Sequence, residues 1–122
     1  QNRPTVSVLV NCGFLEPEQC DVAVAMVELF CKRMGWPVGS VLEIGSGEAI
    51  LDQPFRVFAK WRIKALARAV AVGRSRRMKV TMPISKAFFL KASTKYWLAY
   101  GERNGVTGEQ MATMEIEGQR PS

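Results

Sequence analysis

The sequence predicts an α/β protein with a parallel sheet, and three observations indicate this. Residues 5–12, TVSVLVNC, are β-branched and almost wholly apolar, which is typical of a strand buried on both faces. A second apolar segment at 38–44 follows an amphipathic stretch long enough for a helical crossover. The 122 residues, 48 % hydrophobic and 23 % charged, suit one globular domain or part of one.

The first helix is expected at 17–34. Pro17 suits the first helical position, and Glu16 and Glu18 lie near the unpaired amides of the first turn. Gly35 supplies a left-handed stop, and Pro37 prevents continuation. The expected buried stripe recurs every three or four residues and consists of Ala23, Met26, Val27, Phe30, Cys31 and Met34.

Two more helices are expected, at 53–72 and 83–100. The stripe of the second helix consists of Phe55, Ala59, Ile63, Leu66, Ala67 and Val70. Between these helices MKVTMPI is a candidate strand, but the sheet predicted here has two strands, 5–12 and 38–44. We expect two parts: residues 1–82 form the sheet domain, and residues 83–122 form a helical extension that packs on it or on a partner subunit.

Two strands covered on both faces do not form an independently stable sheet. We therefore expect the sheet to be completed either by a partner chain, as in a homo-oligomer, or by strands that precede residue 1 in a longer fold.

Composition excludes several classes of function. The sequence has no histidine, which removes Ser-His-Asp, Cys-His and histidine-based zinc chemistry. Cys12, Cys20 and Cys31 are spaced by 8 and 11 residues, which fits no compact metal site, so we expect reduced thiols and no bound metal. No apolar run approaches the roughly 20 residues of a bilayer span, and no secretion signal is recognisable, so we expect a cytoplasmic protein.

The net charge of +6 is concentrated in one segment. The cations of that segment are Lys60, Arg62, Lys64, Arg68, Arg74, Arg76, Arg77 and Lys79. Cations near a helix C-terminus complement the helix dipole. We expect a solvated helix face rather than a nucleic-acid surface, because no aromatic-interleaved binding motif accompanies the charge.

The stretch VLEIGSGEAI, residues 41–50, resembles the nucleotide loop of class I methyltransferases, with an acidic residue near the strand end followed by Gly-Ser-Gly. Three features count against an S-adenosylmethionine site. Ala49 replaces the third glycine, MKVTMPI lacks the acidic residue that would hold a ribose, and too few strands follow.

Residues 5–105 taken together resemble the C-terminal half of the flavodoxin-like, NAD(P)H-dependent FMN reductase family. The resemblance is carried by VSVLVNCGF with the nearby Glu16, by the strand ending in GSGE, by a proline-led aromatic helix and by YGERNGV. It implies that Asn11, Cys12, Gly13 and Phe14 contact FMN, with NAD(P)H as electron donor. It also implies that the phosphate-binding loop precedes residue 1 and that GSGE follows the last strand, at the edge of the sheet.

In this family the flavin performs the hydride transfer, so no catalytic side chain is expected in residues 1–122. Residues 11–14, the NCGF turn, also have a purely structural interpretation. In it, Cys12 is a buried thiol, and Phe14 packs onto the helix as a hydrophobic staple. The competing function is a non-enzymatic basic module that binds an acidic partner or nucleic acid.

Overall fold

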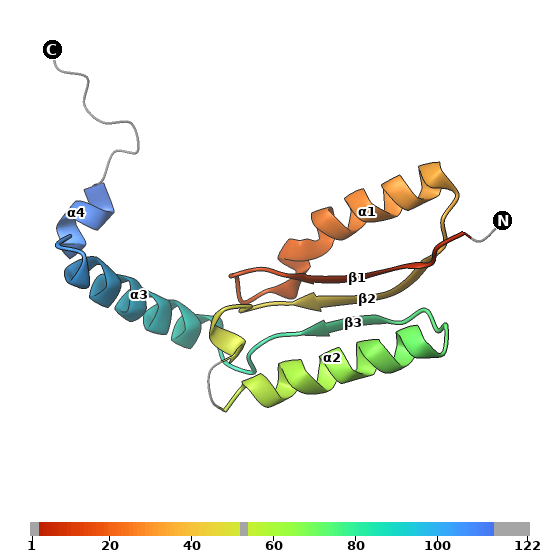
Figure 1. Cartoon of the computed structure of the whole chain (residues 1–122). Helices are drawn as coiled ribbons and strands as arrows, with labels where there is room; N and C mark the ends of the chain where they lie inside the picture. The colour runs from red at the N-terminus through yellow and green to blue at the C-terminus, as the bar shows by residue number, and fades with distance from the viewer. Residues whose placement is uncertain (1–2, 52–53, 114–122) are drawn as a thin grey trace, which may run out of the picture. The chain divides into compact units, whose positions relative to one another are not determined.

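The computed structural model describes residues 3–51 and 54–113. The chain divides into two compact units, Gln1–Pro83 and Ile84–Ser122. In the first unit, strands β1 (Val6–Asn11), β2 (Val38–Ile44) and β3 (Arg77–Val80) form a parallel sheet of order β1-β2-β3 (Figure 1). The predicted α/β class and parallel sheet are therefore confirmed.

The third strand corrects the prediction of a two-stranded sheet. β3 has four residues, RMKV, of which only Met78 is buried. Arg77 and Lys79 alternate with it and point to the other side, so the segment lacks the apolar run by which β1 and β2 were recognised. Because β3 pairs with β2, the strand β2 lies in the centre of the sheet and all of its residues from Ser40 to Ile44 are buried.

The first crossover consists of a 3-10 turn, η1 (Pro17–Cys20), and helix α1 (Asp21–Met34). The predicted helix at 17–34 thus has the correct extent, although its first turn is 3-10. Gly35 ends it in the left-handed conformation, with φ of 69°, as the sequence predicts.

The second crossover consists of a 3-10 turn, η2 (Ala49–Leu51), and helix α2 (Arg56–Ala71). The predicted start at residue 53 lies outside the described residues. The helix ends next to Val72, and Gly73 adopts a φ of 67°.

The two helices lie on opposite faces of the sheet (Figure 1). Val24 of α1 packs with Val8 and Val41, whereas Leu66 of α2 packs with Leu42, and neighbouring strand residues such as Val41 and Leu42 point to opposite faces. With the order β1-β2-β3, the two crossovers therefore have opposite hands, and one of them is of the left-handed type that is rare between parallel strands. Among the strands, α1 packs mainly on β1 and β2, and α2 packs mainly on β2 and β3.

The buried stripes differ from those expected. Helix α1 buries Val24 and Cys31, while Met26 and Phe30, expected inside, are 67 % and 53 % exposed. The apolar side of α1 is wider than the strip that contacts the sheet, and periodicity does not indicate which part of that side faces inward. In α2, Ala59 and Leu66 are buried as expected, and the expected Ile63 and Val70 are exposed.

The second unit contains α3 (Lys86–Arg103) and α4 (Gly108–Thr113). Helix α3 begins three residues later than predicted because Ser85 is its N-cap and accepts a hydrogen bond from the amide of Phe88 at 3.2 Å. The short α4 was not predicted. In the part of the chain that the structure describes, no helix is long and apolar enough to cross a bilayer.

Candidate functional site

The loops that follow β1 and β2 are joined at the carboxyl edge of the sheet. The amide of Cys12 donates to the Ile44 carbonyl at 3.0 Å, and the amide of Gly47 donates back to the Cys12 carbonyl at 2.7 Å. The amide of Ser46 donates to the Phe14 carbonyl at 2.6 Å. The NCGF turn and the GSGE loop therefore form one hydrogen-bonded structure.

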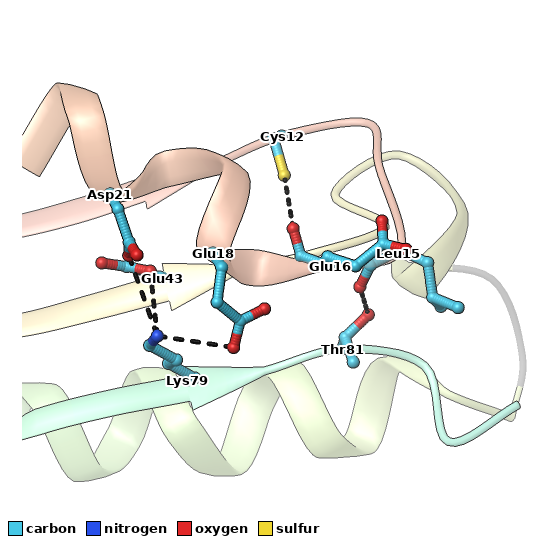
Figure 2. Close-up of polar contacts among 8 residues, drawn as sticks. All are labelled: Cys12, Leu15, Glu16, Glu18, Asp21, Glu43, Lys79 and Thr81. Atoms are coloured by element: carbon cyan, nitrogen blue, oxygen red, sulfur yellow. Dashed lines mark hydrogen bonds and ion pairs between the residues drawn. The ribbon is translucent and has the colours of Figure 1, made fainter. Parts of the chain in front are cut away.

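The end of β3 completes this edge. The Gly45 amide donates to the Val80 carbonyl at 2.8 Å. The Thr81 hydroxyl donates to the Leu15 carbonyl, a contact drawn in Figure 2, and lies 3.0 Å from the Ser46 hydroxyl. All three strand ends are thus held together by hydrogen bonds.

The two glycines of GSGE are required by packing within the chain. A Cβ on Gly45 would lie 2.5 Å from the Leu15 carbonyl oxygen, and a Cβ on Gly47 would lie 2.6 Å from Oδ1 of Asn11. Between them Ser46 is buried with a φ of 53°. The space beside these glycines is filled by Asn11 at the end of β1, by the segment from Leu15 to Pro17 and by Thr81. The expectation that GSGE lies at the edge of the sheet is wrong, because β2 is the central strand.

The four residues expected to contact flavin occupy different environments. Asn11 is exposed, and its side chain lies against Gly47. Cys12 is half-buried, and its thiol donates to the carbonyls of Phe14 and Glu16 at 3.7 and 3.6 Å. Gly13 has no atom within 4 Å of the position that a Cβ would occupy, and the ring of Phe14 is 61 % exposed. The turn therefore presents Gly13 and Phe14 to solvent.

The thiols are free, as expected. Burial, together with the neighbouring Cys12 thiol, raises the pKa of Cys20 to about 11. Since the thiolate is the reactive form, Cys20 is an inert thiol at neutral pH.

A cluster of charges beneath α1 was missed by sequence reasoning. The Lys79 ammonium lies 3.4 Å from a Glu18 oxygen, 3.8 Å from an Asp21 oxygen and 3.9 Å from Oε2 of Glu43 (Figure 2). Glu43 is only 4 % exposed. The signal in the sequence is a carboxylate inside the apolar run VLEI, where it also fits the glycine-loop pattern.

Burial is the main cause that raises the pKa of Glu43, and the hydrogen bond and charge of Asp21 raise it further. The positive charge of Lys79 acts in the opposite direction. For Lys79 itself, desolvation lowers the pKa, but the hydrogen bond to Glu18 and the surrounding carboxylates outweigh it and raise the pKa overall.

The exposed surface of α2 carries the first half of the basic segment, and the cations from Arg74 to Lys79 lie in the following loop and in β3. The exposed cations of α2 are Arg56, Lys60, Arg62, Lys64 and Arg68, and the helix contains no acidic residue. Phe58 and Trp61 form an edge-to-face pair among them, with centroids 5.9 Å apart, and Trp61 is 61 % exposed. Aromatic rings therefore do accompany the charge, contrary to the expectation from the sequence.

Within residues 3–51 and 54–113, no group of three or more Cys, Asp or Glu side chains is arranged to hold a metal ion. The fold and these surfaces define a parallel α/β unit with a hydrogen-bonded loop pair at its carboxyl edge, followed by a helical unit. No protein-family model, curated protein or solved structure is significantly similar to the chain.

Proposed function

We propose that the chain is a flavin-binding module of an NAD(P)H-dependent, FMN-containing oxidoreductase. The observation that carries this proposal is the NCGF turn, fixed by hydrogen bonds at the carboxyl ends of parallel strands, with open space beside Gly13 and an exposed ring at Phe14. Ligands of open α/β sheets bind at this end of the strands.

The residues of the turn fit one side of a flavin. The bare Gly13 allows a planar ring to approach the backbone, and the exposed Phe14 ring offers a face on which an isoalloxazine would stack. Flavin, when bound, supplies the hydride chemistry between NAD(P)H and an acceptor. The role of the chain is to orient the ring and to shield one of its faces from water.

One feature departs from the flavodoxin-like strand order. In the order 2-1-3-4-5 the fifth strand lies at an edge, and the resemblance aligns β2 with that strand. Here β3 pairs outside β2, so the sheet continues one strand further. Helices cover both faces of the sheet, as in a doubly wound architecture, although one of the two crossovers has the rare left-handed connection.

The test is a titration of the chain with FMN, followed by quenching of flavin fluorescence. Two variants address the turn: Gly13→Ala, which meets no atom within 4 Å, and Phe14→Ala. We expect each to weaken FMN binding by about tenfold or more, equivalent to about 1.4 kcal/mol. The control is Phe88→Ala, because Phe88 is similarly exposed, at 58 %, but lies in the second unit.

Absence of quenching at millimolar FMN would reject the flavin module. Quenching that both turn variants leave unchanged would reject the site, because neither substitution removes a packing contact needed for folding.

A second candidate function, binding of single-stranded nucleic acid, is favoured by the basic and aromatic face of α2. Stacking on an exposed Trp61 and phosphate contacts from Lys60 and Lys64 are the ingredients of such surfaces. The test is the salt dependence of oligonucleotide binding in the double variant Lys60→Glu, Lys64→Glu. If both lysines contact phosphates, the slope of log K against log salt falls by about 1.4.

The control for this test is Lys91→Glu, Lys95→Glu, which makes the same charge change at the same spacing in α3. Equal effects of the two double variants would reject α2 as the binding surface. The S-adenosylmethionine alternative has less support, because the space beside Gly45 and Gly47 is filled by the chain itself.

A further inference from the structure

A groove lies on the α1 side of the sheet, and none of its lining residues belongs to the NCGF turn. It is formed by α1, β2 and β3 and has a volume of about 550 Å³. It exists because α1 packs mainly on β1 and β2 and reaches β3 through side-chain ion pairs, Glu28 with Arg77 and Asp21 with Lys79, which line the groove. We propose that the groove binds a small aliphatic amine, with the ammonium group at Glu43 and the alkyl chain along Val24 and Val41.

The first step of the argument is an unsatisfied buried oxygen. Glu43 is 4 % exposed, and its Oε2 atom has no hydrogen-bond partner among the described residues. Lys79 lies 3.9 Å away, which is too far for a hydrogen bond. Buried polar atoms in folded proteins are nearly always hydrogen-bonded, so this oxygen is the natural acceptor for a donor on a ligand.

The second step is the sign of the charge. Arg77 is paired with Glu28, which leaves Lys79 as the cation that faces Glu18, Asp21 and Glu43. Three carboxylates around one ammonium leave an excess of two negative charges when all are ionised. A local excess of negative charge in a chain of net charge +6 attracts a cation and repels an anion.

The third step is the kind of cation. Apolar side chains line part of the groove: Val24 and Ala25 of α1, Val41 of β2 and Met78 of β3, and Ala25 is exposed. Such a surface suits a hydrocarbon chain. No arrangement of side chains within the described ranges suits a metal ion. An alkylammonium ion satisfies both the carboxylate and the apolar lining.

The ionisation of Glu43 adds a pH dependence. Four groups face it: Glu18 and Cys20 from η1, Asp21 from α1 and Lys79 from β3. Burial raises its pKa, and the protonated carboxyl attracts an ammonium ion less strongly. Affinity for an amine should therefore rise with pH through the range in which Glu43 ionises, as long as the amine stays protonated.

The experiment is a titration of the full chain with n-butylamine, followed by ¹H–¹⁵N NMR. Butyrate and n-butanol serve as matched probes with the opposite charge and no charge. We expect saturable shifts at the amides of Glu43 and Lys79 with butylamine alone. Glu43→Gln, which keeps the shape of the side chain, should weaken binding by about tenfold or more, whereas the exposed Glu102→Gln should not change it.

Ala25→Leu provides a second test that does not alter the buried carboxyl. Ala25 is an exposed residue of α1 that lines the groove, and leucine is nearly as good a helix former as alanine, so the variant should fold and block the groove. The proposal is rejected if butylamine gives no saturable shift, if butanol or butyrate binds equally well, or if neither variant weakens binding. These outcomes do not depend on flavin binding, because no residue of the NCGF turn lines the groove.

Discussion

At the scale of single residues, Gly13 and Gly45 lie in neighbouring loops but have opposite surroundings. Gly45 is enclosed by the Leu15 carbonyl, the Thr81 hydroxyl and the Pro17 nitrogen, all within 3.0 Å of a Cβ position. Two of these atoms belong to the backbone and cannot move away cheaply. Gly13 faces open space. One glycine is therefore needed by the fold, and the other is available to a ligand.

This contrast gives the first prediction. Gly45→Ala should lower the free energy of unfolding by about 1–3 kcal/mol, because the new methyl group overpacks the loop junction. Gly13→Ala should be neutral or stabilise by about 0.4–1 kcal/mol, because it restricts the unfolded chain without a clash. Urea denaturation measures both, and a Gly13→Ala variant less stable than Gly45→Ala would contradict the contacts described.

The raised pKa of Glu43 gives the second prediction. A carboxyl whose pKa is higher in the folded state binds its proton more tightly there. Its contribution to stability is fully present below the ordinary value of 4.5 and is lost as pH rises through the raised pKa. In Glu43→Gln this loss is absent, so the stability of the variant relative to the natural chain should increase with pH.

Urea denaturation at several pH values above 4.5 checks this prediction. Glu102→Gln, an exposed carboxyl in the second unit, is the control and should parallel the natural chain. A constant difference between Glu43→Gln and the natural chain across this range would show that the carboxyl titrates at the same pH folded and unfolded.

At the scale of the elements, sequence reasoning located β1, β2, α1 and α2, because each has a long apolar pattern and a clear end signal such as Gly35. It did not place β3 in the sheet. A strand of four residues with two outward cations contributes only Met78 to the core, and its position depends on pairing with β2, which is a tertiary interaction. The side of α1 that faces the sheet is likewise set by tertiary packing and not by local pattern, which is why Val24 is buried and Met26 is exposed.

In the candidate site, too, local patterns predicted some features, while others depend on how the strands pair. Sequence reasoning placed the NCGF turn at the end of a strand, where the structure has it. The contact between Gly47 and Asn11 depends on the register in which Asn11 pairs with Ile44, and local patterns do not specify register between parallel strands. The burial of Glu43 likewise follows from the central position of β2, which requires β3.

A buried hydroxyl of β2 holds the segment that leads into β3. Ser40 is 0 % exposed, and its Oγ donates to the Arg74 carbonyl at 2.6 Å and accepts from the Arg76 amide at 3.0 Å. Removing the hydroxyl leaves both backbone groups without this partner.

We predict that Ser40→Ala lowers the free energy of unfolding by about 1–3 kcal/mol, the cost of unsatisfied buried polar groups. Hydrogen exchange at the amides of β3 should accelerate in the same variant. Ser75→Ala is the control, because Ser75 is exposed and its hydroxyl makes a 3.4 Å hydrogen bond to Val38; its effect should stay within about 0.5 kcal/mol. Equal effects of the two substitutions would show that Ser40 does not anchor β3.

At the scale of the whole molecule, a sheet of three strands with one helix on each face leaves much apolar surface uncovered. The α2 side of β1 exposes 49 % of Leu9. Helix α1 exposes large apolar side chains at helical spacing on its outer side. These are Val22, Met26, Leu29, Phe30 and Met34, which are between 50 % and 72 % exposed. Monomeric proteins seldom leave so broad an apolar stripe in water.

We therefore predict that the chain associates in solution and that the outer stripe of α1 contributes to the contact. Sedimentation velocity should show a sedimentation coefficient that rises with protein concentration, because burying this stripe removes apolar surface from water. Met26→Lys should shift the transition to higher concentration. Val72→Lys is the matched control, since Val72 is 71 % exposed, similar to Met26 at 67 %, but lies just after α2. A coefficient independent of concentration would reject the association, and equal effects of the two lysines would exclude α1 as the contact surface.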